Sequence, residues 1–170
     1  GAMLQDQGHE VELFVYEIPP AGKFDEIWIT TVFTFSIHQE DLYPHPKALG
    51  DYDISLNSNL KVDDETYLEK LKVLPELIKD HRPDLIIYLA GADPFVEDRL
   101  GGFLLSKEGL MARDAYILGL CNKLKIPTAI VLGGGYARNT ADTVDIHLNT
   151  IRVVTGLLEN PELEKVASND

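Results

Sequence analysis

The stretch LIIYLAGADP, residues 85–94, places an apolar run directly before an acidic residue, Asp93. A second apolar run, TAIVL at residues 128–132, leads into GGGY at residues 133–136. Short apolar runs that end at turn residues are typical of buried strands in parallel sheets. Because open α/β sheets bind their ligands beyond the carboxyl ends of such strands, these two turns are predicted to form the functional edge.

Helical patterns lie around both runs and predict the fold class. A helix is expected from residue 63 to about residue 80, kinked at Pro75, and others are expected at 106–123 and 140–158. Strands that alternate with helices favour a parallel sheet whose faces are covered. The sequence therefore predicts an α/β fold with a short, mainly parallel sheet flanked by helices.

The N-terminal part carries a strand pattern with two interpretations. Residues 11–18 and 26–37 are both predicted to be strands, and the Pro-Gly segment at 19–22 is a breaker that would allow a hairpin between them. Residues 8–10 fit the start of a helix equally well. Both interpretations stay open on the sequence.

The rest of the N-terminal half is predicted to be a loop at residues 39–53 and a short strand at 52–56. No repeat or linker divides the chain, so residues 1–170 are predicted to form a single domain. Gly1 and Ala2 are interpreted as a cleavage scar left by a tag.

Composition excludes several classes of function. The 170-residue chain carries 15 Lys and Arg against 28 Asp and Glu, a formal net charge of −13, which argues against nucleic-acid binding. No apolar run is long enough to span or anchor in a membrane. The single cysteine, Cys121, is predicted to be a core residue in a reducing compartment, which favours a cytoplasmic location.

The segment around the two turns resembles the C-terminal half of the zinc-dependent deacetylases, the family of histone deacetylases and acetylpolyamine amidohydrolases. The family motif Gly-x-Asp-Pro-x-x-x-Asp-x-Leu-Gly is matched by GADPFVEDRLG at residues 91–101, and its Gly-Gly-Gly-Tyr loop by residues 133–136. The resemblance covers roughly residues 31–154. QGHE at residues 7–10 is similar to the Gly-His-Glu of the class IV branch and bacterial relatives.

The resemblance implies roles for the residues that match. Asp93 would be a zinc ligand, and the Tyr136 hydroxyl would donate to the substrate carbonyl, with Gly133, Gly134 and Gly135 forming the loop beside it. Such a site needs three protein ligands that leave one zinc position open, and a preorganised oxyanion donor. Without the resemblance, an acid before proline is usually a turn or N-cap residue, and GGGY is also compatible with a phosphate loop or a plain turn.

The resemblance also implies residues that this sequence does not show. The family's Asp-x-His would lie at or before Leu4, and its tandem histidines would lie further upstream. The sequence contains no His-His pair, and its one Asp-x-His, residues 145–147, falls in a predicted helix. Positions i and i+2 of a helix project to nearly opposite sides, so a structural role is expected there. His38, at the end of a predicted strand, is the best other candidate ligand, although a loop-anchoring role is expected for it.

The leading hypothesis is therefore a truncated relative that is not an active deacetylase by itself and that serves as a ligand- or partner-binding module. Zinc is possible only in an altered or incomplete site. The alternative is an active metal-dependent amidohydrolase whose site is completed by His9 or His38, by a second subunit, or by a separately encoded N-terminal half. A third hypothesis is a scaffold in which both loops are relics.

Half of a parallel sheet would leave a strand edge and apolar surface uncovered, which proteins normally avoid. A homodimer, a partner chain or the N-terminal hairpin is expected to cover that edge.

Overall fold

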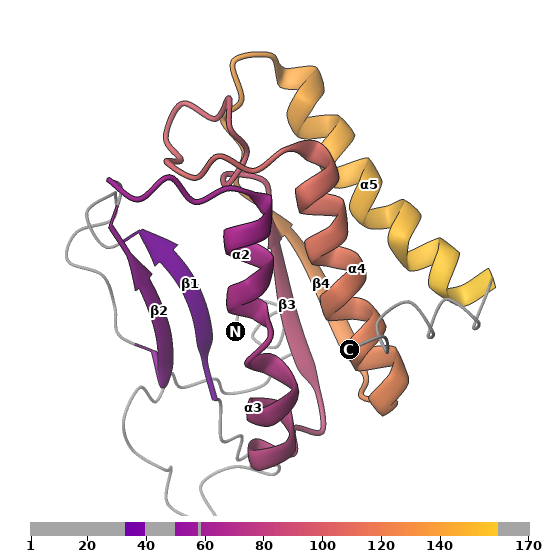
Figure 1. The fold of residues 1–170 in the computed structure, drawn as a ribbon. Helices are drawn as coiled ribbons and strands as arrows, with labels where there is room; N and C mark the ends of the chain where they lie inside the picture. Colours follow the sequence, from indigo (N-terminus) through magenta and orange to yellow (C-terminus); the bar gives the residue numbers. More distant parts are fainter. Residues whose placement is uncertain (1–32, 40–49, 58, 160–170) are drawn as a thin grey trace, which may run out of the picture. The chain divides into compact units, whose positions relative to one another are not determined.

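The computed structural model describes residues 33–39, 50–57 and 59–159 (Figure 1). Its contacts divide the chain into two compact units, Gly1–Phe33 and Thr34–Asp170, and the fold described below is that of the second unit. The predicted strand at residues 11–18, the hairpin and most of the predicted loop lie outside the described residues. The single-domain prediction stays a prediction.

The described strands form two parallel pairs. One pair is β1 (Phe35–Gln39) with β2 (Tyr52–Leu56), and the other is β3 (Ile86–Gly91) with β4 (Thr128–Gly133). Gly91 lies opposite Gly133, so β3 and β4 end level and their following turns start side by side. The predicted parallel α/β fold is confirmed, as two small sheets. Strand β1 runs through His38 to Gln39, so His38 lies within a strand and not after it.

The helix predicted from residue 63 to about residue 80 is two helices, α2 (Asp64–Leu71) and α3 (Leu74–His81). The expected kink at Pro75 is wrong, because the chain leaves the helix before the proline. Pro75 stands in the first turn of α3, where its missing N–H removes no helical hydrogen bond. Asp63 caps α2 by accepting from the Thr66 N–H at 3.0 Å.

The two remaining helices, α4 (Lys107–Leu124) and α5 (Thr140–Glu159), match the predicted ranges closely. Ser106 caps α4, with its hydroxyl oxygen accepting from the Gly109 N–H at 2.9 Å. Helix α4 packs against α5 and α2, and Figure 1 shows it beside the β3–β4 pair. None of the described helices is long and apolar enough to cross a membrane.

The core lies between the helices and the strand ends. Its largest fully buried apolar side chains, each at most 1% exposed, come from five different segments: Val62, Leu71, Leu105, Leu110 and Ile146. Cys121 is 2% exposed, which confirms its predicted place in the core. Leu124, in the last turn of α4, is 45% exposed.

Within the described residues, strands β3 and β4 are covered on one face only, which differs from the prediction that both are buried. Tyr88 and Ala90 point toward α4, whereas Ile87 and Leu89 on the opposite face are 70% and 65% exposed. Val131, the register partner of Leu89 on β4, is 45% exposed. Successive side chains of a strand point to opposite faces, so a single layer of helices covers only half of an apolar run.

Candidate functional site

Asp93 and the glycine loop meet at the carboxyl ends of β3 and β4. The Ala92 N–H donates to the Gly133 carbonyl at 3.0 Å, which joins the two turns directly. Gly134 has a φ of +67°, and a Cβ placed there would lie 2.7 Å from Asp93 Oδ1. Only glycine at position 134 therefore leaves room for the Asp93 carboxylate against the loop.

Asp98 ties the turn after β3 to the loop after β4. Its Oδ1 accepts from the N–H groups of Leu100 and Gly101, each at 2.8 Å, and its Oδ2 accepts from the Tyr136 N–H at 2.6 Å. The Asp98 residue is 9% exposed, so these charge-assisted bonds are largely shielded from water. Sequence reasoning included Asp98 as a motif position but assigned it no role.

Tyr136 is held by its backbone and not by its ring. The N–H and the Nε of Arg99 both donate to the Tyr136 carbonyl at 3.1 Å, so the consecutive residues Asp98 and Arg99 bind the N–H and the carbonyl of Tyr136. Tyr136 itself is 55% exposed. An oxyanion donor gains strength where water is excluded. The described residues thus fix the position of Tyr136 without enclosing its hydroxyl.

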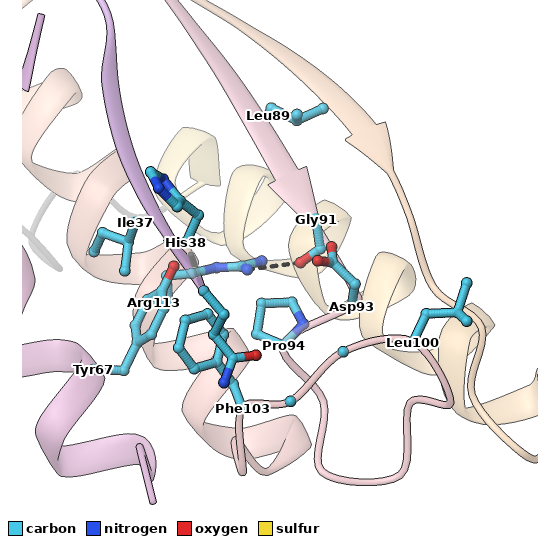
Figure 2. A pocket seen from close by; sticks show the side chains of 13 residues that line it. Ile37, His38, Tyr67, Leu89, Gly91, Asp93, Pro94, Leu100, Phe103 and Arg113 are labelled. Carbon is cyan, nitrogen blue, oxygen red and sulfur yellow. Dashed lines mark hydrogen bonds between the residues drawn. The ribbon is translucent and has the colours of Figure 1, made fainter. Parts of the chain in front are cut away.

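A cavity of about 230 Å³ lies beside Asp93. Figure 2 shows β1 on one side of it and the turn after β3 on the other, with Arg113 between them. His38 lines this cavity, and its Nδ1 is 2.9 Å from Ser36 Oγ and 3.9 Å from the Asp53 carboxylate. Among the other lining residues are Ile37, Gln39, Tyr67, Leu89, Gly101, Phe103 and Arg113. The structure thus brings His38 and Asp93 to one cavity, and Tyr136 is not part of its lining.

A complete metal site is not present within the part of the chain that the structure describes. No group of three or more His, Cys, Asp or Glu side chains there is placed to hold a metal ion. Asp145 pairs with Lys107 at 2.7 Å, while the Nδ1 of His147 is buried without a hydrogen-bond partner. The side chains of Asp145 and His147 on α5 thus have different surroundings, one in an ion pair and one buried. His9 and His45 lie outside the described residues.

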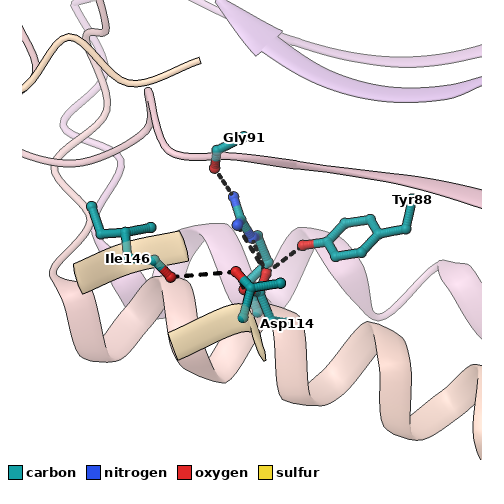
Figure 3. Close-up of polar contacts among 6 residues, drawn as sticks. Tyr88, Gly91, Asp114 and Ile146 are labelled. Carbon is teal, nitrogen blue, oxygen red and sulfur yellow. Dashed lines mark hydrogen bonds and ion pairs between the residues drawn. The ribbon is translucent and has the colours of Figure 1, made fainter. Parts of the chain in front are cut away.

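A buried polar network that the sequence did not predict contacts the end of β3, just before the turn that carries Asp93 (Figure 3). Arg113 Nη1 donates to the Gly91 carbonyl at 2.7 Å and its Nε donates to Asp114 at 2.9 Å. Asp114 also accepts from the hydroxyls of Tyr88 and Thr150, at 2.5 and 2.6 Å. Burial is the main reason that the pKa of Tyr88 is raised, which keeps its hydroxyl protonated as a donor.

The signal for this network in the sequence was a charged pair, Arg113-Asp114, in the middle of α4, where the other residues from 109 to 121 carry no charge. Both residues are almost fully buried, at 3% and 0% exposed. Through the Gly91 carbonyl the pair holds the last residue of β3, two positions before Asp93. Arg113 therefore helps to position the turn that carries Asp93.

Replacing Gly134 with alanine is expected to destabilise the protein by about 1–3 kcal/mol, because the methyl group meets the Asp93 carboxylate and the residue keeps a positive φ. The matched control is Gly119→Ala in α4, where a Cβ meets nothing within 4 Å. That change should stabilise by about 0.5–1 kcal/mol through helix propensity. Urea unfolding of both variants measures the difference, and equal effects would contradict the close packing of loop and carboxylate.

Comparison with known proteins identifies the family. The model of the histone deacetylase domain matches residues 26–151. An uncharacterized protein of Picosynechococcus sp. is 42% identical over 118 residues, which are 69% of this chain and 39% of that protein. The histone deacetylase RPD3 of Saccharomyces cerevisiae is 31% identical over 154 residues, 83% of this chain and 33% of its own length.

A solved structure shares the fold. The acetylpolyamine aminohydrolase of Burkholderia pseudomallei has a TM-score of 0.53 at 20% identity, covering 73% of this chain and 37% of that one. The chain spans between 33% and 39% of the length of the two relatives named above. The family match over residues 26–151 includes the Asp93 turn, the cross-link by Asp98 and the glycine loop, and this chain belongs to the histone deacetylase domain family.

Proposed function

We propose that this chain forms the Asp93 and Tyr136 side of a deacetylase-type site, and that it does not hydrolyse acetylated amines by itself. The observation that carries the proposal is the Asp98 cross-link, which joins the turn that follows Asp93 to the loop that carries Tyr136. The described residues beside it provide no group that could hold a metal ion. Two turns that are held together by hydrogen bonds, but whose described residues lack a full set of metal ligands, fit a ligand- or partner-binding module.

The chemistry of the family explains why half of the site is not enough. Zinc supplies an activated water for amide hydrolysis, and a separate base accepts the proton. Within the described residues, Asp93 is a single carboxylate on an exposed turn, and zinc does not fit that set alone. No hydrolytic step is therefore assigned to these residues. The net charge of −13 favours a cationic ligand, such as a lysine-rich peptide or a polyamine.

An active amidohydrolase is the second candidate, and the open face of β3 and β4 favours it. Leu89 is 65% exposed on that face and also lines the cavity beside Asp93. A second copy or another chain that covered Ile87, Leu89 and Val131 would therefore stand next to the site, where it could contribute ligands. A homodimer, with a cytoplasmic location suited to the free Cys121, belongs to this proposal.

Zinc retention separates the two candidates. The purified chain is exposed to zinc, dialysed and analysed by inductively coupled plasma mass spectrometry beside Asp93→Ala. The expected result is no retained zinc in either protein, because one carboxylate is too few ligands for a zinc site. About one zinc per chain that Asp93→Ala abolishes would contradict the leading proposal and support the enzyme.

Hydrolysis of an acetyl-lysine peptide, measured over a range of protein concentrations with zinc present, completes the test. The leading proposal expects no turnover at any concentration. Turnover per chain that rises with concentration, and that Tyr136→Phe abolishes, would show a site completed between two copies. Asp84→Ala serves as the control for Asp93→Ala, since Asp84 is also an exposed acid but precedes β3 at its other end.

A further inference from the structure

A second hollow, which we call the α3–α4 groove, lies near the amino ends of β3 and β4, whereas Asp93 lies at their carboxyl ends. Its volume is about 680 Å³, and it shares no residue with the cavity beside Asp93. Pro83 and Ile126, which precede β3 and β4, belong to its lining. Its apolar lining consists of Pro75, Ile78, Pro83, Tyr116, Leu120, Leu124 and Ile126.

Two helix stripes form the walls of the α3–α4 groove. On α3 the lining residues are Pro75, Ile78 and Lys79, at the spacing i, i+3 and i+4, and Arg82, the residue that caps the C-terminus of α3, follows them. On α4 they run from Tyr116 through Leu120 to Leu124, four residues apart. Residues at these spacings share one face of a helix. Two helix faces that line one apolar groove can bind a third helix between them.

The charge around the α3–α4 groove differs from that of the whole chain. Lys79, Arg82 and Lys123 line it, and no carboxylate does, although the chain carries 28 Asp and Glu against 15 Lys and Arg. All three cations are exposed, and within the described part of the chain none forms an ion pair with a carboxylate. The groove is therefore an apolar surface with a cationic rim on an acidic protein.

We propose that the α3–α4 groove binds an acidic amphipathic helix of a partner protein. The apolar side chains of that helix, repeated at i, i+3 or i+4, and i+7, pack against Ile78, Leu120 and Leu124. Its Glu or Asp side chains flank the apolar stripe and pair with Lys79, Arg82 and Lys123. Charge complementarity selects this partner, because a basic helix would meet the rim with like charge and a purely apolar one would leave the three cations without partners.

The first test uses three synthetic peptides of about 14 residues, labelled with fluorescein and titrated with the full chain in a fluorescence anisotropy assay. One carries leucines at i, i+3 and i+7 flanked by glutamates. The second replaces each glutamate with lysine, and the third replaces each leucine with serine. Saturable binding is expected for the first peptide, and binding weaker by about tenfold or more is expected for the other two.

Variants of the chain locate the binding surface. Two variants change neighbouring residues at the C-terminal end of α4, Lys123→Glu and Leu124→Ser. Each should lower the affinity of the chain for the acidic peptide by about tenfold. Lys70→Glu is the matched control, because Lys70 occupies the last turn of α2 and does not line the groove, so it should leave affinity within about twofold. Circular dichroism verifies that each variant folds.

Three results would overturn the proposal. The first is no saturable binding of the acidic peptide up to about 1 mM. The second is equal binding of the lysine peptide, and the third is affinity unchanged by Lys123→Glu and Leu124→Ser. If the acidic peptide does not bind and the chain sediments as a dimer that Leu124→Ser dissociates, the occupant is a second copy of this chain.

Discussion

Replacing Asp114 with alanine is expected to lower the free energy of unfolding by about 3–5 kcal/mol, because the change leaves a buried guanidinium without its counter-ion. Asp114 is 0% exposed and Arg113 is 3% exposed, so water cannot take the place of the lost carboxylate. The hydroxyls of Tyr88 and Thr150 lose their acceptor in the same step. A loss of this size is a large share of the stability of an ordinary domain.

Urea unfolding followed by circular dichroism measures the Asp114 effect. The matched control is Asp145→Ala, which removes an exposed carboxylate from Lys107 while Asp142 still pairs with the same ammonium. The control should change stability only slightly. A double variant, Arg113→Met with Asp114→Leu, should recover a substantial part of the loss, because an apolar pair removes the unpaired buried charge. If Asp114→Ala were no more destabilising than Asp145→Ala, the network would not be a buried one.

The second large effect is expected at Asp98. Asp98→Ala leaves the N–H groups of Leu100, Gly101 and Tyr136 without their acceptor, and the expected destabilisation is on the order of 3 kcal/mol. The change should also free the Tyr136 loop from the turn that carries Asp93. Both consequences follow from one carboxylate that bonds to two segments of the chain.

Amide hydrogen exchange tests the Asp98 prediction at the residues concerned. Protection of the amides of Leu100, Gly101 and Tyr136 should fall in Asp98→Ala, since their opening no longer breaks a charge-assisted bond. Glu97→Ala is the control, because Glu97 is exposed and it is its backbone carbonyl that accepts from the Arg138 N–H. Equal protection of Tyr136 in the wild type and in Asp98→Ala would show that Asp98 does not hold the loop.

Local chemistry explains which parts of the fold the sequence could predict. The apolar runs before Asp93 and before Gly133 predicted two parallel strands, and Ser106 predicted the start of α4, because each pattern involves neighbouring residues. The break between α2 and α3 was missed for a related reason. A proline inside a helix kinks it, whereas a proline in the first turn of a helix is favourable. The apolar pattern around Pro75 fits one kinked helix as well as two separate helices, and the structure has two.

Contacts between distant residues decided the rest of the candidate site. Asp63 caps α2, whereas the carboxylate of the neighbouring Asp64 accepts from the N–H and the hydroxyl of Ser106, 42 positions away. The role of Asp98 depends on Tyr136, 38 positions away. The spacing of residues along the chain does not reveal these hydrogen-bond partners, because the partner of a buried polar group depends on how whole helices and strands pack.

The amino-acid sequence by itself determined the α/β class, the family and the pairing of Asp93 with a glycine loop, since strand periodicity and glycine backbone freedom are local properties. The tertiary structure alone decided that Arg113 and Asp114 are buried together, that no described helix or strand covers the second face of β3 and β4, and that three cations surround an apolar groove. Those features arise from which surfaces the helices cover and leave uncovered, and burial is a property of the assembled elements.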